Sequence, residues 1–142
     1  MELTAAQRIQ TLAGSRLFAA IPRSELEVLG EMMRTESFRA GSVVAEAGEP
    51  ADCVFVIAEG TLAVYLHGSA TPMRKLGPGD VLGEYGMVTG AVRSATVKAE
   101  GDATLLSLDY ERFKAYLLRF PEALFVLFES TAKRLVEAER RH

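Results

Sequence analysis

One short stretch of the chain holds the residue types that could bind an anion next to a sugar. Gly83 and Gly86 flank a turn into a short helix, where backbone N–H groups can approach a ligand closely and the helix N-terminus favours negative charge. Arg93 can hold a phosphate with two parallel hydrogen bonds, and Ser94 adds a hydroxyl donor. Ionised Glu84 only accepts hydrogen bonds, which suits a ribose hydroxyl.

Taken singly, each of these residues has a plainer interpretation. An arginine near the start of a strand is usually a solvated surface charge, and Glu84 could be a first-turn acid favoured by the helix dipole. Gly83 and Gly86 could be ordinary turn residues. Their combination favours a ligand site, because a 3′,5′-cyclic nucleotide carries a phosphate and a sugar hydroxyl in one rigid unit.

The stretch resembles the phosphate-binding cassette of cyclic-nucleotide-binding domains, as in bacterial catabolite-activator-type regulators and protein kinase A regulatory subunits. The family pattern runs apolar–Gly–Glu–any–small–apolar, then a short gap, then Arg–small–Ala. Residues 82–87 (LGEYGM) and 93–95 (RSA) fill every position. A second segment, residues 48–60, resembles the family's first glycine-anchored hairpin. The resemblance covers about residues 17–140.

The resemblance implies a role for each residue of the cassette. Glu84 would accept a hydrogen bond from the ribose 2′-OH, Arg93 would pair with the cyclic phosphate, and Ser94 would donate to a phosphate oxygen. Backbone N–H groups near Gly83 and Gly86 would complete the phosphate site. The other positions expected to contact the ligand or to line or support the pocket are Met87, Val81, Leu82, Tyr85 and Ala95.

The chain departs from the family pattern at three places. Val92 precedes the arginine where many members have proline. Ala138 and Glu139 stand where catabolite-activator-type proteins have hydroxyl residues that contact the purine. Those regulators continue into a helix-turn-helix domain, whereas this chain stops at His142. The resemblance favours cyclic AMP over cyclic GMP, and Ser94 is neutral between them because a threonine at that position often accompanies cyclic GMP selectivity.

The elements that would position the cassette can be predicted from periodicity and turn residues. Helical spacing over about residues 4–33 predicts two helices, with a capping box at Thr4 and a cap at Ser24. Short β-forming runs over about residues 35–108 alternate with glycine-rich turns and predict an antiparallel sandwich or barrel that includes the cassette at 82–97. The runs are 43–44, 53–57, 62–66, 81–82, 95–99 and 104–108, with a hairpin tip at 67–70.

Helical spacing returns over about residues 109–141. Asp109 caps a short helix, and Pro121 lies in the first turn of a final one. The first half of that last helix, residues 123–128, is apolar almost all round, which predicts two packing partners: the β-roll and something else. The predicted fold is therefore mainly β, an antiparallel β-roll or jelly roll (double-stranded β-helix) with N- and C-terminal helices, in one domain over residues 1–142.

Composition restricts the other functions open to the chain. A net charge of −3 provides no basic field for nucleic acid. Cys53 is the one cysteine, so neither an internal disulfide nor a four-cysteine iron–sulfur cluster is possible. His67 and His142 are too far apart in sequence to suggest a histidine-rich metal site. The N-terminus lacks the pattern of a signal peptide, and no apolar run reaches 18 residues.

These observations favour a stand-alone, cytoplasmic, bacterial receptor that is not an enzyme and needs no cofactor. Its ligand would be a cyclic nucleotide, and movement of the terminal helices would signal to a partner or a second subunit. One alternative is a pseudo-receptor with a vestigial pocket, which would work through the surface of its last helix. Another is a transcription regulator that lacks its DNA-binding half.

Overall fold

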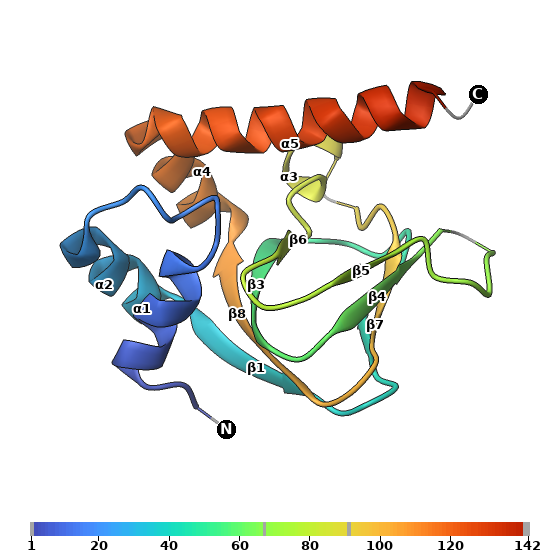
Figure 1. Cartoon of the computed structure of the whole chain (residues 1–142), viewed down its shortest axis with the longest axis horizontal. Helices are drawn as coiled ribbons and strands as arrows, with labels where there is room; N and C mark the ends of the chain where they lie inside the picture. Colours follow the sequence, from blue (N-terminus) through green and yellow to red (C-terminus); the bar gives the residue numbers. More distant parts are fainter. Residues whose placement is uncertain (1, 67, 91, 141–142) are drawn as a thin grey trace.

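The computed structural model describes residues 2–66, 68–90 and 92–140, so the predictions that rest on His67 and His142 lie outside the described residues. Within these ranges, two four-stranded antiparallel sheets face each other, with helices along one side and across the top of the view (Figure 1). The first sheet has the order β1 (Arg34–Phe38), β8 (Ala103–Asp109), β3 (Cys53–Glu59), β6 (Val81–Leu82). The second has the order β2 (Val43–Ala45), β7 (Thr96–Ala99), β4 (Leu62–Tyr65), β5 (Arg74–Leu76). The predicted jelly-roll fold class is confirmed.

Two of these strands, β1 and β5, were not among the predicted runs. Both consist mainly of polar residues, with the sequences RTESF and RKL, so a search for apolar runs does not find them. Pairing with an apolar neighbour holds each in place: β1 pairs with β8, and β5 pairs with β4. Here tertiary pairing determines the strand more than intrinsic propensity does.

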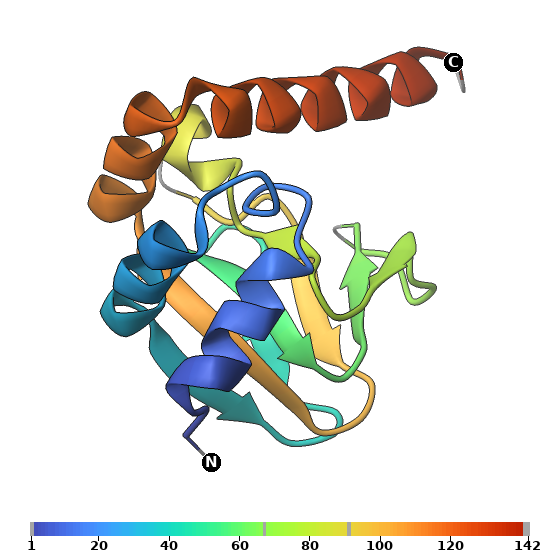
Figure 2. The same ribbon diagram turned by 60° about the vertical axis from the view of Figure 1, so that its left-hand side comes forward.

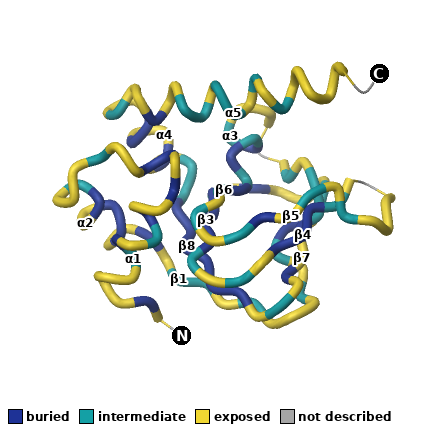
Figure 3. Tube along the Cα trace, viewed as in Figure 1, coloured by how far each residue is buried: buried dark blue, intermediate teal, exposed yellow. Residues whose placement is uncertain are grey.

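The apolar core has two parts, and β3 contributes to both. Phe55 and Ile57 point between the two sheets, while Val54 and Val56 point toward the helices. Figure 3 shows this strand buried along most of its length. Because successive side chains of a strand face opposite sides, a strand covered on both faces is apolar throughout.

The helices are α1 (Ala5–Ala13), α2 (Arg23–Met32), α3 (Gly86–Thr89), α4 (Tyr110–Arg119) and α5 (Pro121–Arg140). The capping box at Thr4, the Asp109 cap and the start of the last helix at Pro121 are confirmed. The Ser24 cap was wrong: α2 begins at Arg23, two residues before the start that a Ser24 cap implies, its N-cap is Pro22, and no side chain caps it. The extended backbone of Pro22 starts this helix before Ser24 is reached.

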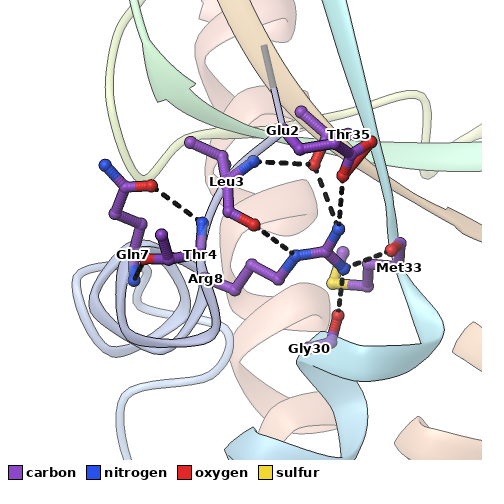
Figure 4. A network of polar contacts seen from close by, with 8 residues as sticks. All are labelled: Glu2, Leu3, Thr4, Gln7, Arg8, Gly30, Met33 and Thr35. Carbon is purple, nitrogen blue, oxygen red and sulfur yellow. Dashed lines mark hydrogen bonds and ion pairs between the residues drawn. The ribbon is translucent and has the colours of Figure 1, made fainter.

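Arg8 of α1 forms hydrogen bonds to the C-terminal end of α2 (Figure 4). The Arg8 guanidinium donates to the carbonyl oxygens of Gly30, at 2.6 Å, and Met33, at the C-terminal end of α2. It also donates to the carbonyl of Leu3 at 3.3 Å and to the Thr35 hydroxyl at 3.1 Å. A cation at a helix C-terminus interacts favourably with the helix dipole. The N-terminal helices and the start of β1 are thereby joined.

Helix α5 runs across the top of the molecule in Figure 1, above α3, and its C-terminal half projects away from α4 in Figure 2. Ala123 is buried on its inner side, where Val126 and Leu127 also pack against the core. The large apolar side chains on its outer side are exposed: Leu124, Phe125, Phe128, Leu135 and Val136. The predicted packing of this helix on the core is thus observed on its inner side, and the second packing partner stays a prediction. Within the described residues, no helix has the length and apolarity that a membrane crossing requires.

Candidate ligand-binding site

The backbone of the cassette needs glycine at two positions. Gly83 follows β6 with a φ of 87°, and a Cβ there would clash with the Arg93 guanidinium and lie 3.1 Å from the Cys53 carbonyl oxygen. At Gly86, the first residue of α3, a Cβ would lie 2.5 Å from the Tyr110 hydroxyl. The same hydroxyl donates a hydrogen bond to the Gly83 carbonyl. Helix α4 therefore holds the turn between β6 and α3.

The backbone of Arg93 is held by hydrogen bonds, whereas its guanidinium keeps N–H donors that have no partner among the described residues. Its backbone N–H donates to the Glu49 carbonyl, and its own carbonyl accepts from the Gly48 N–H, both at 2.9 Å. Residues 48–60, which resemble the family's first hairpin, thus hold the backbone of Arg93 in place. The guanidinium donates to the Cys53 carbonyl at 2.9 Å and lies 5.3 Å from the centre of the Phe55 ring. A guanidinium has five N–H donors, so several remain for an anion.

Glu84 is an acidic side chain in an enclosed position. It is only 6% exposed, and its Oε1 accepts a hydrogen bond of 3.4 Å from Arg134 of α5. Its Oε2 is buried and accepts no hydrogen bond from the described residues. Burial raises the pKa of this carboxyl above its ordinary value, although a backbone hydrogen bond and the charges of Arg134 and Arg74 oppose the shift. An unsatisfied buried acceptor costs about 1–3 kcal/mol, which a ligand hydroxyl would recover.

Arg134 joins the cassette to α5 through two contacts. Besides Glu84, it donates to the Tyr85 hydroxyl at 2.6 Å, and its guanidinium lies 5.6 Å from the centre of the Tyr85 ring. Sequence reasoning did not single out Arg134, because it lies 50 residues from Glu84 in a heavily charged half of α5. Tyr110 was also missed, and nothing in its sequence context marks it.

The cassette lines one cavity together with the second sheet. Eight predicted site residues line it: Leu82, Gly83, Glu84, Tyr85, Gly86, Arg93, Ser94 and Ala95. Ser94 is exposed at the surface. Met87 and Val81 do not line this cavity; both pack against the core between the first sheet and the helices, so they support the cassette from behind. The opposite wall includes Arg74, which sequence reasoning also missed because β5 was not predicted.

This arrangement can bind an anion and a hydroxyl at once. Arg93 and Ser94, which can donate to an anion, line the same cavity as Glu84, whose buried Oε2 is an acceptor unpartnered within the described residues, and as the turn at Gly83 and Gly86. The acceptor would take a hydrogen bond from a sugar hydroxyl, and the donors would surround a phosphate.

Comparison with known proteins agrees with this chemistry. Residues 35–120 match the sequence profile described as "Cyclic nucleotide-binding domain". A cyclic nucleotide-gated potassium channel of Mesorhizobium japonicum is 35% identical over 124 residues, which is 87% of this chain and 33% of the channel. The chain spans between about a quarter and a third of the first such relatives.

Solved structures show the same architecture. The catabolite activator protein of Thermus thermophilus superposes with a TM-score of 0.79 at 26% identity, covering 89% of this chain and 61% of that one. The regulatory domain of Toxoplasma gondii protein kinase A, crystallised with cyclic AMP, superposes with a TM-score of 0.77 at 22% identity, covering 91% and 50%.

Proposed function

This chain belongs to the family of cyclic nucleotide-binding domains, and we propose that it is a receptor for a 3′,5′-cyclic nucleotide. One observation carries the proposal: buried Glu84, whose Oε2 has no hydrogen-bond partner among the described residues, lines the same cavity as Arg93. A cyclic nucleotide supplies both missing partners, because its ribose 2′-OH donates a hydrogen bond and its cyclic phosphate is an anion.

Each cassette residue then has one role. Arg93 pairs with the cyclic phosphate through the donors that the Cys53 carbonyl leaves free. Ser94, exposed at the cavity, donates its hydroxyl to a phosphate oxygen. The turn held open by Gly83 and Gly86 presents backbone N–H groups to the same anion. Glu84 accepts from the ribose 2′-OH through Oε2.

Glu84 also connects the ligand to α5. One of its carboxylate oxygens is available to the ribose, and the other holds Arg134. A ligand that reorients this carboxylate changes the free energy of the Arg134 contact, and therefore the docking of the helix. We propose that α5 carries the signal, by a shift in its position, to a partner or a second copy of the chain.

We also propose the base of the ligand, the protein partner and the cellular location of this receptor. The protein kinase A domain named above was crystallised with cyclic AMP, which supports cyclic AMP as the first expectation for the base. The exposed outer side of α5 supports a second copy of this chain as the partner. We propose binding rather than catalysis, in the cytoplasm, with residues 1–142 folding as one domain.

The exposed apolar side chains of α5 also favour one other function. In that case the pocket is vestigial, and the chain works as a protein-interaction module through its last helix. Binding of nucleotide separates the two functions, since an interaction module has no need of the cassette arginine.

Calorimetric titration with cyclic AMP and cyclic GMP tests the receptor proposal. We expect micromolar binding of at least one nucleotide, about −8 kcal/mol. Arg93→Ala should weaken it by roughly 30-fold to several thousand-fold, because removing one partner of a buried charged pair costs about 2–5 kcal/mol. Arg39→Ala is the matched control, since Arg39 is exposed and does not line the cavity. If folded wild-type protein binds neither nucleotide at millimolar concentration, the receptor proposal is wrong.

A further inference from the structure

Tyr110 joins the cassette to the first sheet and to α4. It is the first residue of α4, and its backbone N–H donates to the Asp52 carbonyl at 2.9 Å, one residue before β3 begins. Its half-buried ring packs against the core between the first sheet and the helices. The hydroxyl at the end of this ring donates to the Gly83 carbonyl in the cassette. The position of the hydroxyl is therefore set by elements outside the cassette.

The Gly83 carbonyl benefits from such a partner because a glycine does not fix its own backbone. A residue without a Cβ adopts positive and negative φ about equally readily, so the turn alone leaves the orientation of its peptide groups open. In the folded protein Gly83 has a φ of 87°. Gly86 lies beside the same hydroxyl, since a Cβ there would lie 2.5 Å from it. The Tyr110 hydroxyl thus selects one orientation of the peptide that follows Gly83.

The orientation of this peptide decides where the Glu84 N–H points. The Gly83 carbonyl and the Glu84 N–H belong to one planar trans peptide unit, so they point in opposite directions. A carbonyl held by Tyr110 therefore turns the N–H away from that tyrosine. The N–H instead interacts with the carboxylate of its own residue: burial raises the pKa of Glu84, and this backbone hydrogen bond opposes the rise. One peptide group thus connects the Tyr110 hydroxyl with the Glu84 carboxylate.

We propose that Tyr110 is a positioning residue of the receptor, an inference that rests on the proposed function. Its hydroxyl holds the peptide between Gly83 and Glu84, and this peptide holds the Glu84 carboxylate where it accepts a hydrogen bond from the ribose 2′-OH. Tyr110 does not line the cavity of the cassette, so it acts on the ligand through Glu84 and not by contact. Sensitivity to Tyr110 should therefore be confined to ligands that carry the 2′-OH.

Titration of wild type and Tyr110→Phe with a cyclic nucleotide and with its 2′-deoxy analogue tests this role. The substitution keeps the ring in the core and removes only the hydroxyl. The nucleotide should bind the variant about 2- to 12-fold more weakly, which corresponds to the roughly 0.5–1.5 kcal/mol of one hydrogen bond. The 2′-deoxy analogue has no hydroxyl for Glu84, so wild type and variant should bind it equally well. Equal weakening of both ligands would overturn the role.

Tyr116→Phe is the matched control. Tyr116 lies on the same helix, does not line the cavity, and likewise donates its hydroxyl to a backbone carbonyl, that of Leu17, at 3.0 Å. Both variants should unfold at a lower urea concentration than wild type, because each loses one such hydrogen bond. Only Tyr110→Phe should lose affinity for the nucleotide. A similar loss of affinity in both variants would contradict the positioning role, because any weakening of α4 would then disturb the site.

The pKa of the Glu84 carboxyl, measured by ¹³C NMR in the ligand-free protein, tests the same role without nucleotide. In Tyr110→Phe the peptide before Glu84 loses its fixed orientation, and its N–H leaves the carboxylate for part of the time. The pKa of Glu84 should therefore be higher than in wild type, and Tyr116→Phe should leave it unchanged. An unchanged pKa in Tyr110→Phe would overturn the positioning role. If wild type binds no nucleotide, the proposed function is wrong, whereas this pKa still decides whether Tyr110 positions Glu84.

Discussion

Glu84 is a buried acidic residue that has a free hydrogen-bond acceptor for a ligand. Its carboxylate is 6% exposed, with one oxygen on Arg134 and the other unpartnered. Such an arrangement costs free energy in the unliganded protein, because burial disfavours the charged form and the second oxygen has no donor. The function proposed for Glu84 explains why the chain tolerates this cost.

The pH dependence of stability should report that cost. Folding raises the pKa of Glu84 above its ordinary value of 4.5, so the folded state binds the proton more tightly than the unfolded state. The contribution of Glu84 to stability is therefore fully present below pH 4.5 and is lost as the pH rises through the folded pKa. Each unit of difference corresponds to about 1.4 kcal/mol.

Urea unfolding of wild type and Glu84→Gln between pH 4 and 8 measures this effect. Glutamine does not titrate, and the effect of the Arg134 ion pair, which requires an ionised Glu84, is already contained in the folded pKa of Glu84. We expect the free energy of unfolding of wild type to fall relative to the variant as the pH rises above 4.5. Two curves that stay parallel would show that Glu84 titrates normally in the folded protein.

At the scale of elements, α5 has two different faces. Its inner side packs on the core and contacts the cassette through Arg134. On its outer side, residues 124–136 carry five exposed large apolar side chains over about 18 Å of helix. A patch of this kind on a soluble protein usually marks an interaction surface. A second copy of the same helix would bury both patches in one symmetric interface.

Sedimentation of the protein at about 100 μM tests the pairing of α5 with a second copy. Wild type should sediment as a dimer. Phe128→Glu should be monomeric, because a two-fold interface would place two unpaired carboxylates in its apolar centre. Val28→Glu should remain dimeric, since Val28 is an exposed apolar residue, 50% accessible, on α2 instead. A monomeric wild type at this concentration would contradict the pairing.

At the scale of the whole molecule, local sequence predicts most of the fold and one side of the site. The cassette is readable because its glycines, Glu84 and Arg93 lie within eleven consecutive residues, 83–93. The strands that bury apolar runs and the caps at Thr4 and Asp109 are local signals too. The opposite wall is not local. Arg74 lies on a polar strand defined only by its pairing with β4, and Arg134 reaches Glu84 across 50 residues.

The central claim is that the cassette holds a cyclic nucleotide, and amide NMR of ¹⁵N-labelled protein tests it residue by residue. On titration with cyclic GMP or cyclic AMP, we predict the largest shifts at residues 83–86 and 94–95, with smaller shifts in α5 around Arg134. Arg93→Ala should need at least about 30-fold more nucleotide to show the same shifts. No shifts in wild type at millimolar nucleotide, or shifts confined to the outer side of α5, would contradict the account.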